Sequence, residues 1–302
     1  MSSIFSRRAF LGAAALLPLA ACASQEKPAV TTSAPPPSTA AAPQRHDRLV
    51  ELEREFDARI GVYALHTGTG ATVEHRAEER FAFCSTFKGL AAAAVLARHP
   101  LSYLDTVVRY GKEELLKSAV VTSKHVATGM SLRELCDAAV RYSDGTAGNL
   151  LLREVGGPAK LTEYVRSLGD TVTRMDRTEP TLTEATPGDP RDTSSPRALG
   201  EDYRKIVLGD ALPAEKRAFL RDLLERNTTG GQRIRAKVPA GWTVADKTGT
   251  GDYGTLNDIG IVWPPGGAPV VVAVMSSKAA KDAEYKQAVV AEAAGYVLGK
   301  LT

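Results

Sequence analysis

The sequence has few cysteines and no histidine pattern of the kind that binds zinc. Three Cys in 302 residues are too few for a disulfide framework or a Cys-rich metal module. The five His are scattered, without an H-x-H or H-E-x-x-H spacing. Charge is nearly balanced, with 38 Lys and Arg against 35 Asp and Glu, which gives no electrostatic reason for a nucleic-acid partner. We therefore expect a globular protein with no metal site and no nucleic-acid partner.

The N-terminal apolar run is too short to cross a membrane. Residues 9–19 give about eleven apolar positions, whereas a transmembrane helix needs about 20. Arg7 and Arg8 precede this run, and paired arginines there are typical of a twin-arginine export signal. The sequence Leu-Ala-Ala-Cys that follows resembles a bacterial lipobox, which predicts cleavage that leaves Cys22 as a lipidated N-terminus. The alternative is a plain signal peptide cut at the A-x-A pattern of residues 21–23.

The segment after the export signal has the composition of a tether. Residues 23–45 are rich in Pro, Ala, Ser and Thr and lack apolar periodicity, so we expect an extended connection. Residues 1–22 are then the signal with its lipobox, and residues 46–302 are the folded domain. We expect a lipoprotein of the cell envelope that touches the membrane only through Cys22. Without lipidation, the protein would be periplasmic or secreted.

Hydrophobic patterns place strands at both ends of the folded domain and helices between them. Strands are predicted over residues 60–65, 72–75, 243–247, 259–263 and 269–275. Helices are predicted over residues 49–60, 85–98, 161–168, 213–226 and 285–298. Helical pattern also covers residues 131–151, with Ser143 in a loop between two helices. The expected fold class is α/β of the α+β type, an antiparallel sheet built from both termini and flanked by helices. Residues 46–83 and 226–302 would form a sheet subdomain, and residues 84–225 an inserted all-helical subdomain.

A serine and a lysine near the start of a buried helix could form a nucleophile and its base. Ser85 and Lys88 are one helical turn apart and share a face. A desolvated lysine can take the proton of a serine hydroxyl, and a helix N-terminus favours negative charge on a bound carbonyl oxygen. The same S-x-x-K spacing also occurs by chance in the tether, at Ser24 and Lys27. Alone, the motif is explained better by a solvated helix start than by a catalytic pair.

Two further motifs have the same ambiguity when taken singly. Ser143, followed by Asp144 and Gly145, fits a turn that caps a helix. Lys247, Thr248 and Gly249 end a predicted strand, where Lys247 could bind a carboxylate and Gly249 lets a ligand approach the backbone. An edge strand protected by a lysine is the alternative.

Together and in this order, the three motifs resemble those of serine β-lactamases and penicillin-binding proteins. Residues 46–302 are similar to class A β-lactamases in particular, because residues 177–182 match the omega loop of that family. The resemblance implies that Arg177 and Asp192 pin the ends of this loop and that the Glu179–Pro180 bond is cis. It makes Glu179 the general base that activates the deacylating water, a residue that penicillin-binding proteins lack.

The resemblance implies a role for each motif residue. Ser85 is the nucleophile, and either Lys88 or Glu179, through a water, takes its proton. Ser143 passes a proton to the departing lactam nitrogen, while the backbone N–H groups of Ser85 and Thr250 hold the oxyanion. Substrate binding falls to Gly145, Arg233, Lys247, Thr248, Gly249 and Thr250. No cofactor is implied, the partner is a small-molecule β-lactam, and we expect a monomer.

Several positions depart from the usual family pattern. Gly145 stands where most members have Asn, which predicts a wider cleft and matches the Ser-Asp-Gly of the mycobacterial branch. Thr183 replaces the Asn that helps to hold the deacylating water, and Ser118 replaces a large gate residue, which predicts an open entrance. Arg233 matches the arginine that actinobacterial members use where this chain has Leu256, the alternative being an exposed charge at a helix end.

Two other features are expected to have no chemical role. We expect Cys84 and Cys136 to be buried free thiols, because the family's partner position for Cys84 is Gly251 here. Residues 249–254 match G-x-G-x-x-G, but a strand rather than a helix follows them, so no dinucleotide site is expected.

The function implied by the resemblance is hydrolysis of the β-lactam ring of penicillins and cephalosporins, which confers resistance. One alternative is a penicillin-binding D,D-peptidase. Another is a non-hydrolysing β-lactam-binding lipoprotein, which Gly145 and Thr183 leave open.

Overall fold

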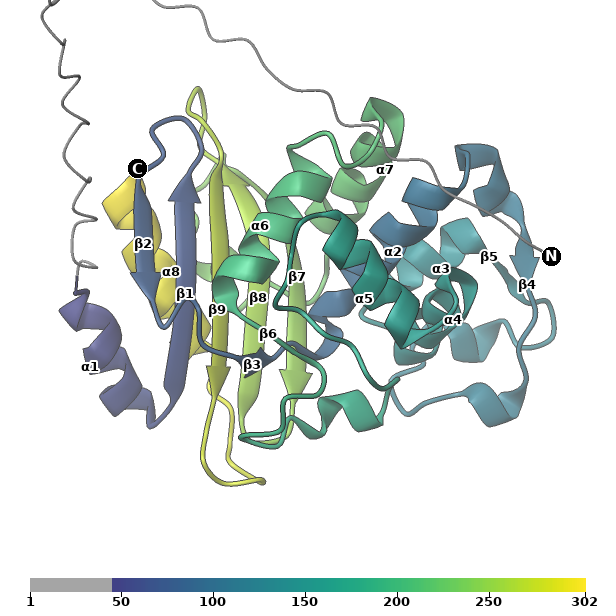
Figure 1. The fold of residues 1–302 in the computed structure, drawn as a ribbon, viewed down its shortest axis with the longest axis horizontal. Coiled ribbons are helices and arrows are strands. Elements are labelled where there is room, and N and C mark those ends of the chain that lie inside the picture. The colour runs from purple at the N-terminus through teal and green to yellow at the C-terminus, as the bar shows by residue number, and fades with distance from the viewer. Residues whose placement is uncertain (1–44) are drawn as a thin grey trace, which may run out of the picture. The chain divides into compact units, whose positions relative to one another are not determined.

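The computed structural model describes residues 45–302, which form a five-stranded antiparallel sheet with helices on both faces (Figure 1). The strand order is β2–β1–β9–β8–β7. Two strands come from the start of the described chain and three from its end: β1 (Arg59–His66), β2 (Thr72–His75), β7 (Thr243–Gly251), β8 (Thr255–Trp263) and β9 (Val270–Ser277). The predicted antiparallel sheet built from both ends of the domain is confirmed.

Helices occupy most of the segment between β2 and β7. The α-helices of the described chain are α1 (Asp47–Phe56), α2 (Phe87–Arg98), α3 (Leu132–Arg141), α4 (Gly145–Val155), α5 (Pro158–Ser167), α6 (Pro196–Val207), α7 (Ala214–Glu225) and α8 (Ala288–Leu301). The first and last helices of the described chain cover one face of the sheet, opposite the face that α6 covers. Short strand pairs link β3 (Phe81–Ala82) to β6 (Thr193–Ser194), and β4 (Val107–Val108) to β5 (Met130–Ser131). A 3₁₀ turn, η1 (Cys84–Thr86), runs directly into α2.

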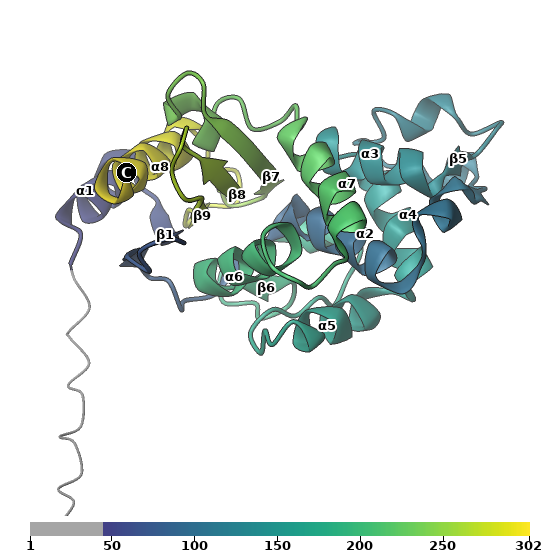
Figure 2. The same cartoon turned by 90° about the horizontal axis from the view of Figure 1, so that it is seen from above.

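The central strands are apolar on both faces because both faces are covered. Along β9, Val272 and Val274 belong to the core that includes residues of α1 and α8. Their neighbours Ala273 and Met275 belong to the second core, which includes residues of α2 and α6. Figure 2 shows α1 and α8 on one side of the sheet and α6 on the other. A strand covered on both faces loses the apolar–polar alternation of a half-exposed strand.

Some predicted boundaries are wrong where a helix meets a strand. The helix predicted over residues 49–60 ends at Phe56, and Asp57 adopts a left-handed conformation with φ of 46°. Ile60 lies instead in β1 and is fully buried there. Ile60 is four residues after Phe56, which is a helical spacing, but its side chain is apolar because it lies in a buried strand. The closing helix begins three residues later than predicted, at Ala288.

The sequence analysis missed α6. Its start carries two ordinary signals, because the Ser195 hydroxyl accepts a hydrogen bond from the backbone N–H of Ala198 at 3.2 Å, and Pro196 occupies the first turn. The helix packs against β9, β1 and β8 and so belongs to the cover of the sheet. The division into sheet and helical subdomains at the predicted boundaries stays a prediction.

Other predicted features are present. A helix begins at residue 132, close to the predicted start, and Ser131 and Glu134 form a capping box there. Residues 249–254 are the end of β7 and the turn into β8, so the G-x-G-x-x-G match belongs to a hairpin, as expected. The export signal, Cys22 and nearly all of the tether lie outside the described residues.

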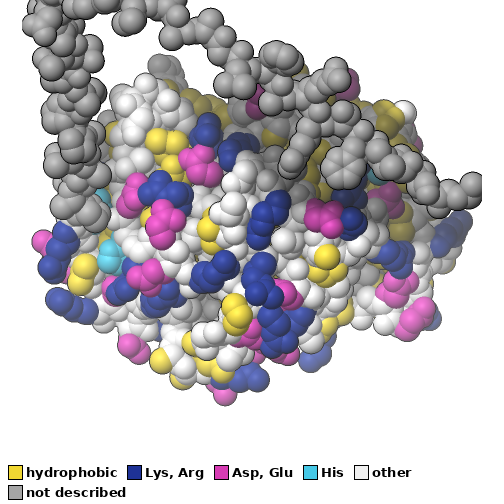
Figure 3. Space-filling model, viewed as in Figure 1, with side chains coloured by type: hydrophobic (Ala, Val, Ile, Leu, Met, Phe, Trp, Pro, Cys, Tyr) yellow, Lys and Arg dark blue, Asp and Glu magenta, His cyan; other side chains and the backbone are white. Residues whose placement is uncertain are grey.

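The surface of the described domain carries mixed charge. Basic and acidic side chains lie interspersed on the face shown in Figure 3. Many of them form ion pairs, such as Arg59 with Glu79 and Arg191 with Asp189, each at 2.6 Å. Within residues 45–302, none of the helices has both the length and the hydrophobicity that a membrane crossing requires.

Candidate active site

A cavity of about 780 Å³ collects most of the predicted site residues. It is lined from η1, the 115–120 segment, the loop after α3, the omega loop and β7. The predicted residues on its wall are Ser85, Ser143, Glu179, Thr183, Arg233, Thr248, Gly249 and Thr250. A larger cavity of about 890 Å³ lies against the other side of the omega loop, and none of the predicted catalytic residues lines it. The smaller cavity is therefore the candidate site.

Ser85 is held at the start of α2 between two possible proton carriers. Its Oγ donates to Glu179 Oε1 at 2.8 Å and accepts from Lys88 Nζ at 2.9 Å. The preceding Cys84 has a left-handed φ of 48°, a strained conformation for a residue with a side chain. A Cβ atom at Gly148 would lie 2.6 Å from Lys88 Cε, so α4 can approach the lysine this closely only with glycine there.

Lys88 is fully buried and touches three members of the site. Its Nζ lies 2.7 Å from Glu179 Oε1 and donates to the Ser143 carbonyl at 2.8 Å, besides its bond to Ser85. Ser143 has a left-handed φ of 57°, and Asp144 caps α4 as predicted by accepting from the backbone N–H of Ala147 at 2.9 Å. The acceptors around Lys88 Nζ satisfy the hydrogen-bonding capacity of an amine that is shielded from water.

Lys247, on β7, contacts the hydroxyl of Ser143. Its Nζ donates to Ser143 Oγ at 3.0 Å, while Lys88 Nζ lies 3.5 Å from that oxygen. Burial and, next, the positive charge of Lys88 lower the pKa of Lys247 to about 7. The Ser143 hydroxyl thus stands between two buried amines and can pass a proton between them and a ligand.

Arg233 is buried, so the alternative of an exposed helix-end charge is wrong. Only 4% of it is exposed, and burial lowers the pKa of its guanidinium. The guanidinium donates to the Gly249 carbonyl at 2.8 Å and to Thr250 Oγ1 at 2.7 Å. Gln287 accepts from its Nε at 2.6 Å. Lys247 Nζ donates to the Thr248 carbonyl at 3.0 Å, so two cationic side chains lie along this part of β7, an arrangement suited to a carboxylate.

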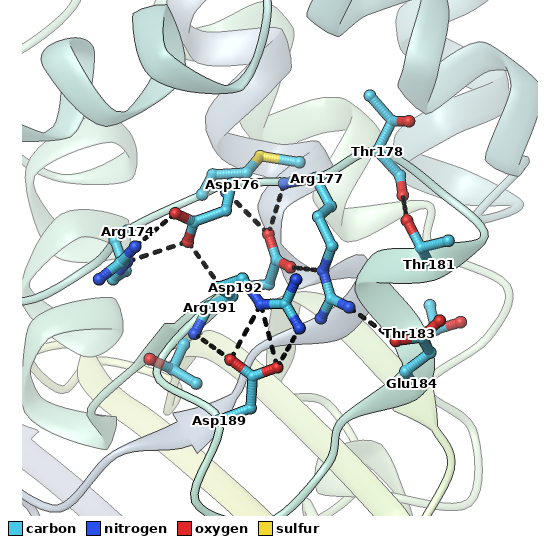
Figure 4. A network of polar contacts seen from close by, with 12 residues as sticks. Arg174, Asp176, Arg177, Thr178, Thr181, Thr183, Glu184, Asp189, Arg191 and Asp192 are labelled. Carbon is cyan, nitrogen blue, oxygen red and sulfur yellow. Dashed lines mark hydrogen bonds and ion pairs between the residues drawn. The ribbon is translucent and has the colours of Figure 1, made fainter.

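The omega loop has its predicted fastening. Arg177 Nε pairs with Asp192 Oδ2 at 2.6 Å, and Arg177 Nη1 pairs with Glu184 at 2.7 Å (Figure 4). Asp192 is fully buried and also accepts from the backbone N–H groups of Asp176 and Arg177. The Glu179–Pro180 bond is cis, as expected. These contacts hold the ends of the loop that carries Glu179.

The sequence analysis missed Asn149, which fixes the backbone of Glu179. The Asn149 amide donates to the Glu179 carbonyl at 2.8 Å and accepts from the Glu179 N–H at 3.0 Å. Its only signal in the sequence is a single amide residue in the otherwise apolar part of α4. Gln287, which holds Arg233, was also missed, and no local pattern marks it.

The wider cleft expected at Gly145 is not found. A Cβ atom there would overlap Ser118 Oγ and Glu179 Oε2, so these two groups already occupy the space that a side chain would take. Thr183 lines the cavity, and its hydroxyl donates to the Pro180 carbonyl at 2.7 Å. The backbone carbonyl of Thr183 accepts from Asp252 N at 2.9 Å, which ties the omega loop to the end of β7.

The two described cysteines are buried and unpaired, as expected. Burial raises the pKa of both thiols, that of Cys136 to about 12. A Cβ atom at Gly251 would lie 2.7 Å from Cys84 Sγ, which is where a bridging residue would have to stand. Within the part of the chain that the structure describes, no three His, Cys, Asp or Glu are grouped to hold a metal ion.

A serine in contact with a lysine and a glutamate, beside a cationic corner, is the arrangement that acyl transfer through a serine requires. The chain also matches the model of the Beta-lactamase enzyme family over residues 44–298. It belongs to this family.

Known relatives agree in sequence and in structure. The β-lactamase of Mycobacterium tuberculosis (strain ATCC 25177 / H37Ra) is 56% identical over 261 residues, which cover 84% of this chain and 85% of the relative. The carbapenem-hydrolyzing β-lactamase KPC of Klebsiella oxytoca is 55% identical over 251 residues, 82% of this chain and 86% of the relative. A class A β-lactamase structure from Mycobacterium abscessus has a TM-score of 0.81 at 49% identity and covers 84% of this chain and 98% of its own. The chain is thus a member of the class A serine β-lactamases, and the predicted β-lactamase-like fold is confirmed.

Proposed function

We propose that this protein hydrolyses the β-lactam ring of penicillins and cephalosporins through an acyl-enzyme on Ser85, and thereby confers resistance. The observation that carries the proposal is the position of the Ser85 hydroxyl, 2.9 Å from Lys88 Nζ and 2.8 Å from Glu179 Oε1. A nucleophile with a base in direct contact can attack without a prior rearrangement.

In acylation, Ser85 Oγ forms a bond to the lactam carbonyl carbon while its proton leaves. The Ser85 hydroxyl is in contact with both Lys88 Nζ and Glu179 Oε1, and either of them can accept this proton. The backbone N–H groups of Ser85 and Thr250 stabilise the oxyanion. The carbon–nitrogen bond of the ring then breaks, and Ser143 delivers a proton to that nitrogen. Its contacts with Lys88 and Lys247 allow the proton to be replaced.

Before deacylation, the proton taken from Ser85 passes by way of Lys88 to Ser143 and replaces the one given to the lactam nitrogen, so Glu179 is ionised again. In deacylation, Glu179 takes a proton from a water that attacks the ester carbonyl, and this proton passes to Ser85 Oγ as the ester bond breaks. The paired hydrogen bonds from Asn149 hold the Glu179 backbone in place for this step. Thr183, at the cavity wall, helps to position the water. A D,D-peptidase has no residue in the role of Glu179, so this carboxylate favours hydrolysis over lasting acylation.

Substrate binding is assigned to the cationic corner of the cavity. Arg233 and the hydroxyls of Thr248 and Thr250 line the cavity and bind the substrate carboxylate, with Gly249 leaving the strand edge free for the ligand. Lys247 is fully buried next to Thr248 and adds its positive charge to this carboxylate site. We assign the chain to the branch with Ser-Asp-Gly at residues 143–145, a placement that the Mycobacterium relatives support. The proposal also includes export by the twin-arginine route, lipidation of Cys22 and a monomeric state.

The decisive experiment is intact-protein mass spectrometry of residues 46–302 over time after addition of excess benzylpenicillin. A penicilloyl adduct that appears and then clears, while the drug gains one water, supports a β-lactamase. A lasting adduct favours the D,D-peptidase or the non-hydrolysing binding protein. Unmodified protein beside intact drug contradicts all three. Glu179→Gln should convert the transient adduct into a lasting one, whereas Ser85→Ala should form none.

A further inference from the structure

Two exposed apolar side chains stand at the mouth of the catalytic cavity. Val120 is 51% exposed and Tyr142 is 38% exposed, and both line the cavity that contains Ser85 and Glu179. Within residues 45–302, only two other large apolar side chains are comparably exposed, Val107 and Tyr285, and neither lines this cavity. We call Val120 and Tyr142 the apolar rim.

The apolar rim is held in place by the polar residues beneath it. Asp144 Oδ2 accepts from the backbone N–H groups of Val121 at 2.8 Å and Thr122 at 2.9 Å, which fastens the turn that carries Val120. Tyr142 caps the end of α3, and the guanidinium of Arg141 lies 5.0 Å from the centre of its ring. A surface ordered before binding loses little entropy when a ligand covers it.

The position of the rim indicates that the ring fused to the lactam is the part of the substrate that lies beside it. Tyr142 directly precedes Ser143, whose hydroxyl marks the place of the lactam nitrogen, and Lys247 marks the place of the carboxylate. The ring fused to the lactam joins these two groups, so it must lie along this side of the cavity. Ser118 carries only a hydroxymethyl group and leaves the rim uncovered. The surface is therefore continuous with the catalytic site, and a substrate in that site is its natural occupant.

We propose that the apolar rim, Val120 and Tyr142, binds the outward substituent of the fused ring, next to the carboxylate, and favours cephalosporins in which this group is large and aromatic. The inference rests on the proposed function. Burying an aromatic group against two apolar side chains removes apolar surface from water on both partners.

Two cephalosporins with the same thienylacetyl side chain provide the test. Nitrocefin carries a dinitrostyryl group on the fused ring, whereas cephalothin carries the smaller acetoxymethyl group. Steady-state kinetics should show that Val120→Ser and Tyr142→Ser each raise the KM for nitrocefin about three- to tenfold, with less than a twofold change for cephalothin. The kcat values should change little, because the rim touches no reacting atom. Tyr142→Phe keeps the ring and should keep the wild-type KM.

Val107→Ser is the matched control, because Val107 is 53% exposed and lies on β4, away from the cavity. It should leave both KM values unchanged. Equal increases for the two drugs, or no increase for either, would overturn the proposal. Thermal melting of each variant separates a loss of folding from a loss of binding. Absence of turnover in the wild-type protein would instead contradict the proposed function itself.

Discussion

At the scale of single residues, burial sets the proton chemistry of this site. Lys88 and Lys247 are both fully buried, and both lie within 3.5 Å of the Ser143 hydroxyl. Two buried ammonium groups this close disfavour each other's charge, and burial disfavours it further. For Lys247, burial and, next, the positive charge of Lys88 lower the pKa to about 7.

The lowered pKa of Lys247 predicts that kcat/KM falls in mildly alkaline solution. Above a pKa of about 7 the free enzyme loses the charge that attracts the substrate carboxylate. If only the charged form binds, kcat/KM should fall roughly fivefold between pH 7 and pH 8. Lys247→Arg keeps its charge throughout this range, so its pH profile should be flat there. Parallel profiles for the two proteins would show that Lys247 does not control binding.

Gly145 leads to a second prediction at this scale. A Cβ atom at this position would overlap Glu179 Oε2 and Ser118 Oγ, so Gly145→Ala should displace the carboxylate from Ser85. A displacement of about 1 Å costs on the order of 100-fold in rate, and the acyl-enzyme should accumulate because deacylation depends most on Glu179. Pre-steady-state mass spectrometry measures this directly. Gly231→Ala is the control, since a Cβ atom at Gly231 meets nothing within 4 Å.

The residues of the site differ in how well the sequence predicts them. Ser85 and Lys88 are three apart across the 3₁₀ turn η1 and the first turn of α2, so their contact follows from local helical geometry. The contact of Arg233 with Gln287 joins residues 54 apart, and that of Asn149 with Glu179 joins residues 30 apart. Nothing local to either partner specifies the other. Such contacts form only when distant elements pack together, and local sequence patterns do not predict that packing.

At the scale of elements, α6 shows the opposite case. Its start signals at Ser195 and Pro196 are local and legible, yet its middle contains Asp202, an acid that faces the core. Both carboxylate oxygens of Asp202 are buried without a donor among residues 45–302. Burial and the neighbouring Asp170 carboxylate raise the pKa of Asp202 to about 9. An acid in this position breaks the apolar pattern by which a packed helix is recognised.

The raised pKa of Asp202 predicts a pH-dependent effect on stability. The folded state keeps a proton on Asp202 up to about pH 9, whereas the unfolded chain releases it near pH 4. The folded state therefore binds more protons in this range, and stability falls as pH rises. Asp202→Asn cannot titrate, so it should raise the free energy of unfolding by about 1–3 kcal/mol at pH 8 and by less at pH 5.

Chemical denaturation at the two pH values measures this difference. The exposed Asp282 supplies the control, and Asp282→Asn should change stability equally little at both values. A gain for Asp202→Asn that does not grow with pH would mean that the acid is already ionised in the folded protein.

At the scale of the whole molecule, the site depends on both ends of the domain. Ser85 and Ser143 come from the helical segment, while Lys247 comes from β7, in the part of the sheet formed late in the chain. The antiparallel sheet built from both ends of the domain was predictable because its central strands are apolar and bounded by turns, whereas the order of the strands was not predicted. The meeting of β7 with η1 was expected only from the family resemblance, since no short-range pattern links residues 85 and 247.

If these segments unfold together, the two cysteines of the described domain should become reactive together. Cys84 directly precedes the nucleophile, Cys136 lies in α3, and both are fully buried. A buried thiol with a raised pKa provides almost no thiolate to an aromatic disulfide reagent. In residues 46–302, neither should react in buffer, and both should react over the denaturant range in which circular dichroism reports unfolding. Val107→Cys, at a position that is 53% exposed, should react at once and shows that the reagent is active. Reaction of Cys84 before Cys136 would instead mean that the segment around Cys84 and Ser85 unfolds locally while the rest of the domain stays folded.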